Sequence, residues 1–139
     1  AKLSLQIDAP CYNLLLFSFY EKENQTSGTD QNFFLRRQDE IFHYFLRHPQ
    51  YILFRLNVNS YGVLIKSEEA QMEKLAENGL DHIRRVCIPE ESRISWYVAV
   101  GEVVERLSML PQCYLQASHY FAYRFVMPGT HILTVHLFN

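Results

Sequence analysis

The chain has 139 residues, of which 48% are hydrophobic and 20% are charged, and its formal net charge is −2. This length suits one domain with a substantial core, and the composition is that of a globular rather than a disordered protein. The slight acidic excess argues against direct binding of DNA or RNA, because phosphate contacts from basic residues dominate the affinity of such domains.

Hydrophobic periodicity divides the chain into strands and helices of ordinary length. In chain order we expect a strand at 12–20, a helix at 30–47, strands at 51–56 and 61–66, a helix at 67–87, a strand at 94–100, a helix from 111 to about 127 and a strand at 131–138. The polar segment 21–30 predicts a loop between the first strand and the first helix.

Capping residues and glycines mark the element boundaries. Asp30 and Ser67 are candidate N-caps of the first two helices. Gly62, together with Asn57 and Asn59, supplies the turn chemistry of a hairpin between the second and third strands. Gly79 counts against an unbroken second helix.

Aromatic residues indicate which faces are buried. Trp96 and Tyr97 are neighbours on one strand and point to opposite sides, so we expect one ring to be buried and the other to be partly exposed. On the last helix, the stripe of Tyr114, Phe121 and Phe125 is expected to lie in the core.

The predicted order is β-α-β-β-α-β, followed by α-β. The first six elements predict an α+β protein with a ferredoxin-like core, in which helices pack on one face of an antiparallel sheet, extended by a C-terminal helix and strand. No internal repeat or linker divides the sequence, so we expect residues 1–139 to form a single domain.

The three cysteines, Cys11, Cys87 and Cys113, predict neither a disulfide framework nor a zinc site, since no CxxC spacing occurs. Reduced, partly buried thiols in a cytosolic protein are expected. The longest apolar runs are far too short to span a membrane, and no leader peptide is recognisable. Because the chain starts at Ala1 without a methionine, we expect it to be an excised domain of a larger protein.

The βαββαβ core is also the scaffold of nucleotide cyclases, in which carboxylates of the first strand and the hairpin hold metal ions. Mg²⁺ requires such hard oxygen ligands. Here the first strand, 12–20, and the hairpin, 55–66, contain no acid, and Glu21 and Glu23 lie just beyond the strand. We therefore predict no cyclase activity, no metal site and no cofactor.

The remaining candidates for catalysis are also poorly placed. Cys113 and His119 are six residues apart on one helix, which puts them on different faces. His131 and His136 point to opposite faces of the last predicted strand. Neither a Walker loop nor a GxGxxG element occurs. The sequence predicts no catalytic residue.

A stretch of about forty residues carries a family resemblance. It reads ISWYVAVGE at 94–102, VERLS at 104–108, LP at 110–111, then Tyr114, AS at 117–118, FAYRF at 121–125 and PG at 128–129. This order and spacing resemble the middle domains of Gram-positive response regulators of the YesN type. The stretch is also similar to the degenerate GGDEF-like domains of CdaR and PucR-type regulators.

The resemblance implies a cytoplasmic bacterial transcription regulator of a two-component system. In that family a receiver domain comes first and an AraC-type helix-turn-helix domain comes last, and both lie outside this chain. Where active GGDEF enzymes have their signature hairpin, this chain has NVNSYG at 57–62, which removes the metal and substrate residues. The implied role is non-catalytic: the domain contacts other domains of the same regulator and a second copy, and reaches DNA only through the helix-turn-helix domain.

An alternative is a small-ligand sensor that retains a vestigial cyclase cleft for a nucleotide-like molecule. In this hypothesis Arg36 or Arg55 meets an anion. The neutral hydrogen-bonding groups would come from Asn57, Asn59, Ser60 and Tyr61.

Overall fold

The computed structural model describes residues 10–22 and 32–138. Within them, one five-stranded sheet has the order β2-β3-β1-β4-β5. Its strands are β1 (Cys11–Glu21), β2 (Tyr51–Arg55), β3 (Ser60–Ser67), β4 (Ile94–Val100) and β5 (Ile132–Leu133). The α-helices are α1 (Phe33–Arg47), α2 (Glu69–Cys87) and α3 (Leu110–Ala122). Short 3-10 helices are η2 (Ile88–Glu90), η3 (Leu107–Met109), η4 (Tyr123–Phe125) and η5 (Val135–Phe138).

The predicted α+β fold with a ferredoxin-like core is confirmed. The central strand β1 pairs antiparallel with β3 and with β4, and β2 completes the hairpin with β3. The added strand β5 differs from the prediction of a fully antiparallel sheet, because it runs parallel to β4. A parallel neighbour requires a crossover connection, and α3 is the helix in that connection.

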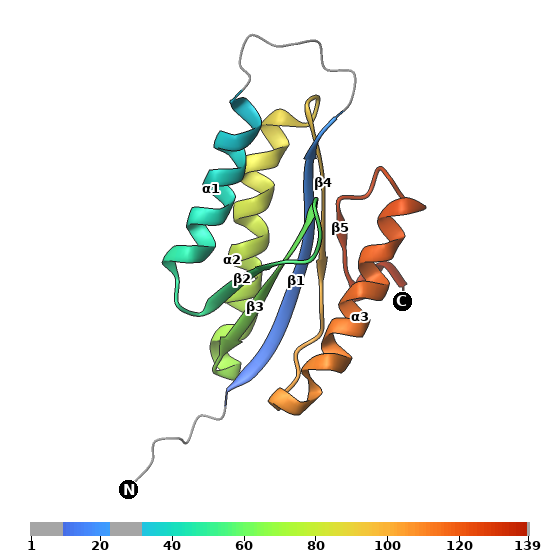
Figure 1. Ribbon diagram of the computed structural model, residues 1–139. Helices are drawn as coiled ribbons and strands as arrows, with labels where there is room; N and C mark the ends of the chain where they lie inside the picture. The colour runs from blue at the N-terminus through green and yellow to red at the C-terminus, as the bar shows by residue number, and fades with distance from the viewer. Residues whose placement is uncertain (1–9, 23–31, 139) are drawn as a thin grey trace, which may run out of the picture.

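The third helix does not share a face with the other two. Figure 1 shows α1 and α2 on one side of the sheet and α3 on the other. The predicted packing on one face concerned the two helices of the ferredoxin-like core and holds for α1 and α2, whereas the sequence assigned no face to the added helix α3. The reason for the position of α3 lies in β1, where Leu15 and Phe17 enter the core beneath α1 and α2 while Leu16 enters the core beneath α3. A strand that is apolar on both faces is stable in water only when other elements pack on both of its faces.

Packing on both faces of the sheet also explains why both neighbouring aromatic residues of β4 are buried. Trp96 and Tyr97 are only 1% and 7% exposed, so the expectation of one exposed ring is wrong. On α3 the expected core stripe is only partly buried: Phe121 is 6% exposed, but Tyr114 is 39% and Phe125 is 73% exposed. The α-helix ends at Ala122, before Phe125. Phe125 is therefore not on the helical face that contacts the sheet.

The core between α1, α2 and the sheet is rich in aromatic rings. Phe45 is fully buried, with its ring centroid 6.1 Å from that of Phe17 and 5.0 Å from that of Tyr51. At Gly79 a Cβ would lie 3.0 Å from Phe45 Cε1 and 3.1 Å from Leu15 Cδ1. Since α2 continues through Gly79 without a break, the expected interruption is wrong, and the glycine instead lets the helix approach its neighbours closely.

Two predicted boundaries also change, and a third falls on a residue that the structure does not describe. Asp30 lies outside the described residues, and Ser67 is the last residue of β3 rather than the N-cap of α2. The last strand stops at Leu133, because the Thr134 hydroxyl accepts a hydrogen bond from the His136 backbone N–H at 3.3 Å and the chain turns. Each α-helix in the described part of the chain is too short or too polar to cross a lipid bilayer.

His82 lies where α2 faces α1. Its Nε2 is 2.8 Å from the carbonyl oxygen of Glu40, and its ring stacks on Tyr44 with the centroids 4.2 Å apart. Burial lowers the pKa of His82 from its ordinary value; the charges of Arg85 and Arg47 act in the same direction, while Glu40 opposes them. The folded chain therefore binds a proton at His82 less readily than the unfolded chain does.

This difference predicts a stability that depends on pH. The contribution of neutral His82 is fully present above its unfolded pKa of about 6.5, and is lost as the pH falls through the lowered folded value. Urea denaturation between pH 7.5 and pH 5 should show the free energy of unfolding falling less steeply in His82→Phe than in the wild type. The control His43→Phe, at an exposed position on α1, should keep the wild-type slope. Equal slopes in all three proteins would contradict the prediction.

Candidate functional site

The hairpin residues predicted to bind a ligand fall into two environments. Asn57 and Asn59 are exposed at the turn, where Asn57 Oδ1 accepts a hydrogen bond from the Asn59 N–H at 3.0 Å. The carbonyl oxygen of Ser60 accepts from the backbone N–H groups of Leu56 and Asn57. Ser60 and Tyr61 are themselves buried, at 2% and 4% exposure.

Tyr61 belongs to the aromatic core. Its ring centroid is 5.4 Å from that of Phe17 and 4.9 Å from that of Phe42. Its hydroxyl accepts a hydrogen bond from Arg55 Nη2 at 3.3 Å. None of the four hairpin residues lines either of the two cavities described below. Ligand binding by the hairpin stays a prediction.

The residues considered for catalysis lie apart. Cys113 is fully buried, and burial raises the pKa of its thiol to about 11, whereas His119 is exposed on another face of α3. His131 stacks on Trp96 with the ring planes at 4°, and His136 is exposed in the C-terminal segment. Among the residues that the structure describes, no group of three or more His, Cys, Asp or Glu side chains is placed to hold a metal ion.

The sequence also offered two glutamates near the end of β1 as possible metal ligands. Glu21 is the last residue of β1 and pairs with Ile94 of β4, and Glu23 lies outside the described residues. The hairpin that β2 and β3 form contains no acid. No second carboxylate from the hairpin therefore approaches β1 in the way that a two-strand metal site requires.

A partly exposed apolar surface lies on the α3 side of the sheet. Because α3 packs mainly on β1 and β4, Phe54 of β2 and Leu64 of β3 are only partly buried on this side, and Ile52 of β2 is exposed. The surface surrounds a cavity of about 430 Å³. We call it the apolar face and define it by its lining residues, which are Leu14, Phe54, Leu64, Leu107, Leu110, Pro111 and Tyr114.

The apolar face carries no charge and is accessible. Leu107 is 59% exposed, and the neighbouring strand residue Ile52 is 55% exposed. Figure 1 shows β2 at the edge of the sheet, away from α3. An exposed apolar area bordered by a free strand edge is typical of an interaction surface.

Gly62 determines the shape of this surface. It is not part of the turn, as the sequence suggested, but lies inside β3 opposite Phe54 of β2. A Cβ at Gly62 would lie 2.2 Å from Phe54 Cζ, so the aromatic ring rests directly on the glycine backbone. A single glycine inside a strand pattern is the sequence signal for such a close approach.

No protein-family model matches the chain, and no curated protein matches it. A crystal structure of a hydantoinase/carbamoylase family amidase from Burkholderia ambifaria is similar at a TM-score of 0.42 and 9% sequence identity. The similarity covers 90% of this chain and 34% of the amidase chain, so this chain spans about a third of that protein's length.

Proposed function

We propose that this chain is a non-catalytic interaction domain that self-associates through the apolar face. The observation that supports this is the uncharged, accessible surface beside β2, with Leu107 and Ile52 each more than half exposed. Water-exposed apolar area of this kind is unfavourable, and its burial against another protein contributes to association in proportion to the area removed from water.

A second copy of the same chain is the partner that fits this surface best. Two identical apolar faces meet without bringing like charges together, although each chain has a net charge of −2. The free edge of β2 adjoins the face and offers backbone groups to β2 of a second copy. Such a contact is self-complementary, as a two-fold dimer requires.

The biological setting that we propose is a cytoplasmic bacterial two-component response regulator. The stretch that resembles YesN-type middle domains contains β4 and α3, and four residues of the apolar face, from Leu107 to Tyr114, lie within it. In this role, self-association brings together the receiver and helix-turn-helix domains of two subunits. A dimer of DNA-binding domains reads two half-sites at a fixed spacing.

Sedimentation equilibrium tests the proposal. We expect the wild type to show a monomer–dimer equilibrium and Leu107→Glu to weaken the dimer by about tenfold or more, because a desolvated carboxylate without a partner costs at least 1–2 kcal/mol. The matched control is Leu35→Glu on α1, since Leu35 is 53% and Leu107 is 59% exposed. It should dimerise as the wild type does.

Two results would contradict the proposal: a wild type that stays monomeric at millimolar concentration, or equal weakening by both variants. Both substitutions are at exposed positions and should leave the unfolding transition nearly unchanged, within about 0.5 kcal/mol. In a full-length regulator that contains this chain, Leu107→Glu should reduce transcription of a reporter gene while Leu35→Glu does not. An unchanged reporter with a weakened dimer would contradict the regulatory role alone.

A further inference from the structure

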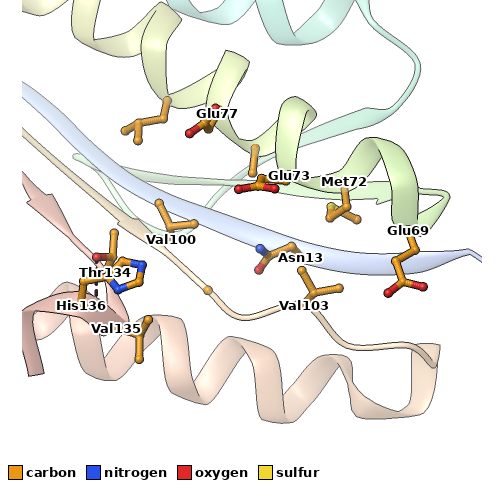
Figure 2. Close-up of a pocket in the computed structure, with 13 residues that line it drawn as sticks. Asn13, Glu69, Met72, Glu73, Glu77, Val100, Val103, Thr134, Val135 and His136 are labelled. Atoms are coloured by element: carbon orange, nitrogen blue, oxygen red, sulfur yellow. Dashed lines mark hydrogen bonds between the residues drawn. The ribbon is translucent and has the colours of Figure 1, made fainter. Parts of the chain in front are cut away.

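A second cavity lies between α2 and the C-terminal segment, next to the point where β1 and β4 stop pairing. It has a volume of about 480 Å³, within the range of small-molecule sites. Figure 2 shows Glu73 and Glu77 of α2 on one side of it and Thr134 and His136 on the other. Val100 lies between them, and Asn13 of β1 lines the cavity next to Val103.

Asn13 is 3% exposed, and its oxygen is already engaged. Oδ1 accepts a hydrogen bond from the Leu14 backbone N–H at 2.8 Å and from the Cys113 thiol at 3.6 Å. These two donors fix which end of the amide is oxygen and which is nitrogen. Nδ2 therefore points the other way, toward the cavity, as Figure 2 shows. Among the described residues, the side-chain hydrogen bonds of Asn13 are the two that Oδ1 accepts.

The position of Asn13 follows from the path of β4. The two strands pair from Leu15 and Val100 onward, and the Gly101 N–H makes a last bond to the Leu14 carbonyl at 2.9 Å. Beyond that point the Leu14 N–H has no strand partner, and the Asn13 side chain supplies one. The same bond holds the amide nitrogen in the cavity wall, where it can donate a hydrogen bond to a ligand oxygen.

The α2 side of the cavity is acidic. Glu69, Glu73 and Glu77 are four residues apart, so their carboxylates lie on one face of the helix at intervals of about 6 Å. All three are exposed, and none forms an ion pair with another described residue. Between this row and Asn13 the wall is apolar, with Met72 and Val100.

We infer that this cavity binds a small amphipathic cation. The ligand has one ammonium or guanidinium group beside the glutamates, an apolar body against Met72 and Val100, and a neutral carbonyl oxygen that accepts from Asn13 Nδ2. A free amino acid or a phosphate does not fit, because its anionic group would face three carboxylates. This site is independent of the self-association proposed above, since it shares no lining residue with the apolar face.

Three dipeptide probes test the inference in the intact chain by NMR. L-leucyl-L-leucinamide has the ammonium and a neutral carboxamide; N-acetyl-L-leucyl-L-leucinamide lacks the ammonium, and L-leucyl-L-leucine adds a carboxylate. We expect the first to shift the side-chain amide signals of Asn13 and to bind at least about tenfold more tightly than the other two, with affinity falling as salt is added. Equal binding of the acetylated probe, or no shift of Asn13 at 20 mM, would overturn the inference.

Charge substitutions on α2 give a second test. The double variant Glu73→Gln and Glu77→Gln should weaken binding of L-leucyl-L-leucinamide by about fivefold to tenfold, because each exposed ion pair contributes modestly. Asp39→Asn, an exposed acid on α1, is the control and should bind as the wild type does. Val103→Phe, at the cavity wall, should also reduce binding by filling the space. Unchanged affinity in the double variant would contradict the role of the glutamates.

Discussion

Replacing Phe45 by alanine should lower the free energy of unfolding by roughly 3–5 kcal/mol. The ring is fully buried between α1, α2 and β1 and contacts Phe17, Tyr51 and His82. It also fills the space left by the missing side chain of Gly79. Alanine leaves a cavity that these rigid rings cannot close, since they are held by their own backbones. A loss of this size is a large part of the stability of an ordinary domain.

Urea denaturation, followed by far-UV circular dichroism, measures this loss. The matched control is Phe125→Ala, because Phe125 was expected in the core from the sequence but is 73% exposed. The control should change the free energy of unfolding by no more than about 0.5 kcal/mol. Comparable losses in the two variants would place Phe125 in a core and contradict the described end of α3.

The ferredoxin-like core could be predicted from the sequence because its signals are local. The aromatic run of β1, the helical periodicity of α2 and the proline after it each depend on residues that are close in the chain. The predicted ends of β2 and β3 agree with the observed ends to within one residue. Gly62, however, packs against Phe54 inside the hairpin and does not form its turn.

The position of α3 depends on a longer-range effect. Its stripe of Tyr114, Phe121 and Phe125 is compatible with packing on either face of the sheet, so periodicity alone could not choose. The choice follows from β1, whose even-numbered residues Leu14 and Leu16 are as apolar as the odd-numbered ones. A continuous apolar run in a central strand indicates cover on both faces, and this signal in 12–20 could have predicted the three layers.

Neither cavity could be located from sequence patterns. The apolar face exists because α3 stops short of β2 and β3, which is a matter of helix placement rather than of residue type. In the cavity between α2 and the C-terminal segment, the orientation of the Asn13 amide depends on a contact with Cys113, which is 100 residues away in the sequence. The one local hint is a glycine: Gly101 directly follows β4, at the point where a side chain would collide with Asn13.

Replacing Gly101 by valine is the second substitution for which we expect a large loss of stability. In Gly101→Val a Cβ would lie 2.9 Å from Asn13 Oδ1 and 3.2 Å from Cys113 Sγ, both of which are enclosed between β1 and α3. The valine must push α3 away from the sheet or break the bond between Asn13 and the Leu14 N–H. Overpacking of this kind costs about 1–3 kcal/mol, and an unsatisfied Leu14 N–H adds about 1 kcal/mol or more.

Thermal and urea unfolding of Gly101→Val should be compared with Gly129→Val, because a Cβ at Gly129 meets no atom within 4 Å. Both variants stiffen the unfolded chain equally, so their difference isolates the collision beneath α3. We expect the free energy of unfolding to fall by at least about 2 kcal/mol more in Gly101→Val. Equal stability of the two variants would mean that α3 is held loosely enough to move aside. In that case Cys113 could not fix the orientation of the Asn13 amide, and the donor in the cavity wall would lose its support.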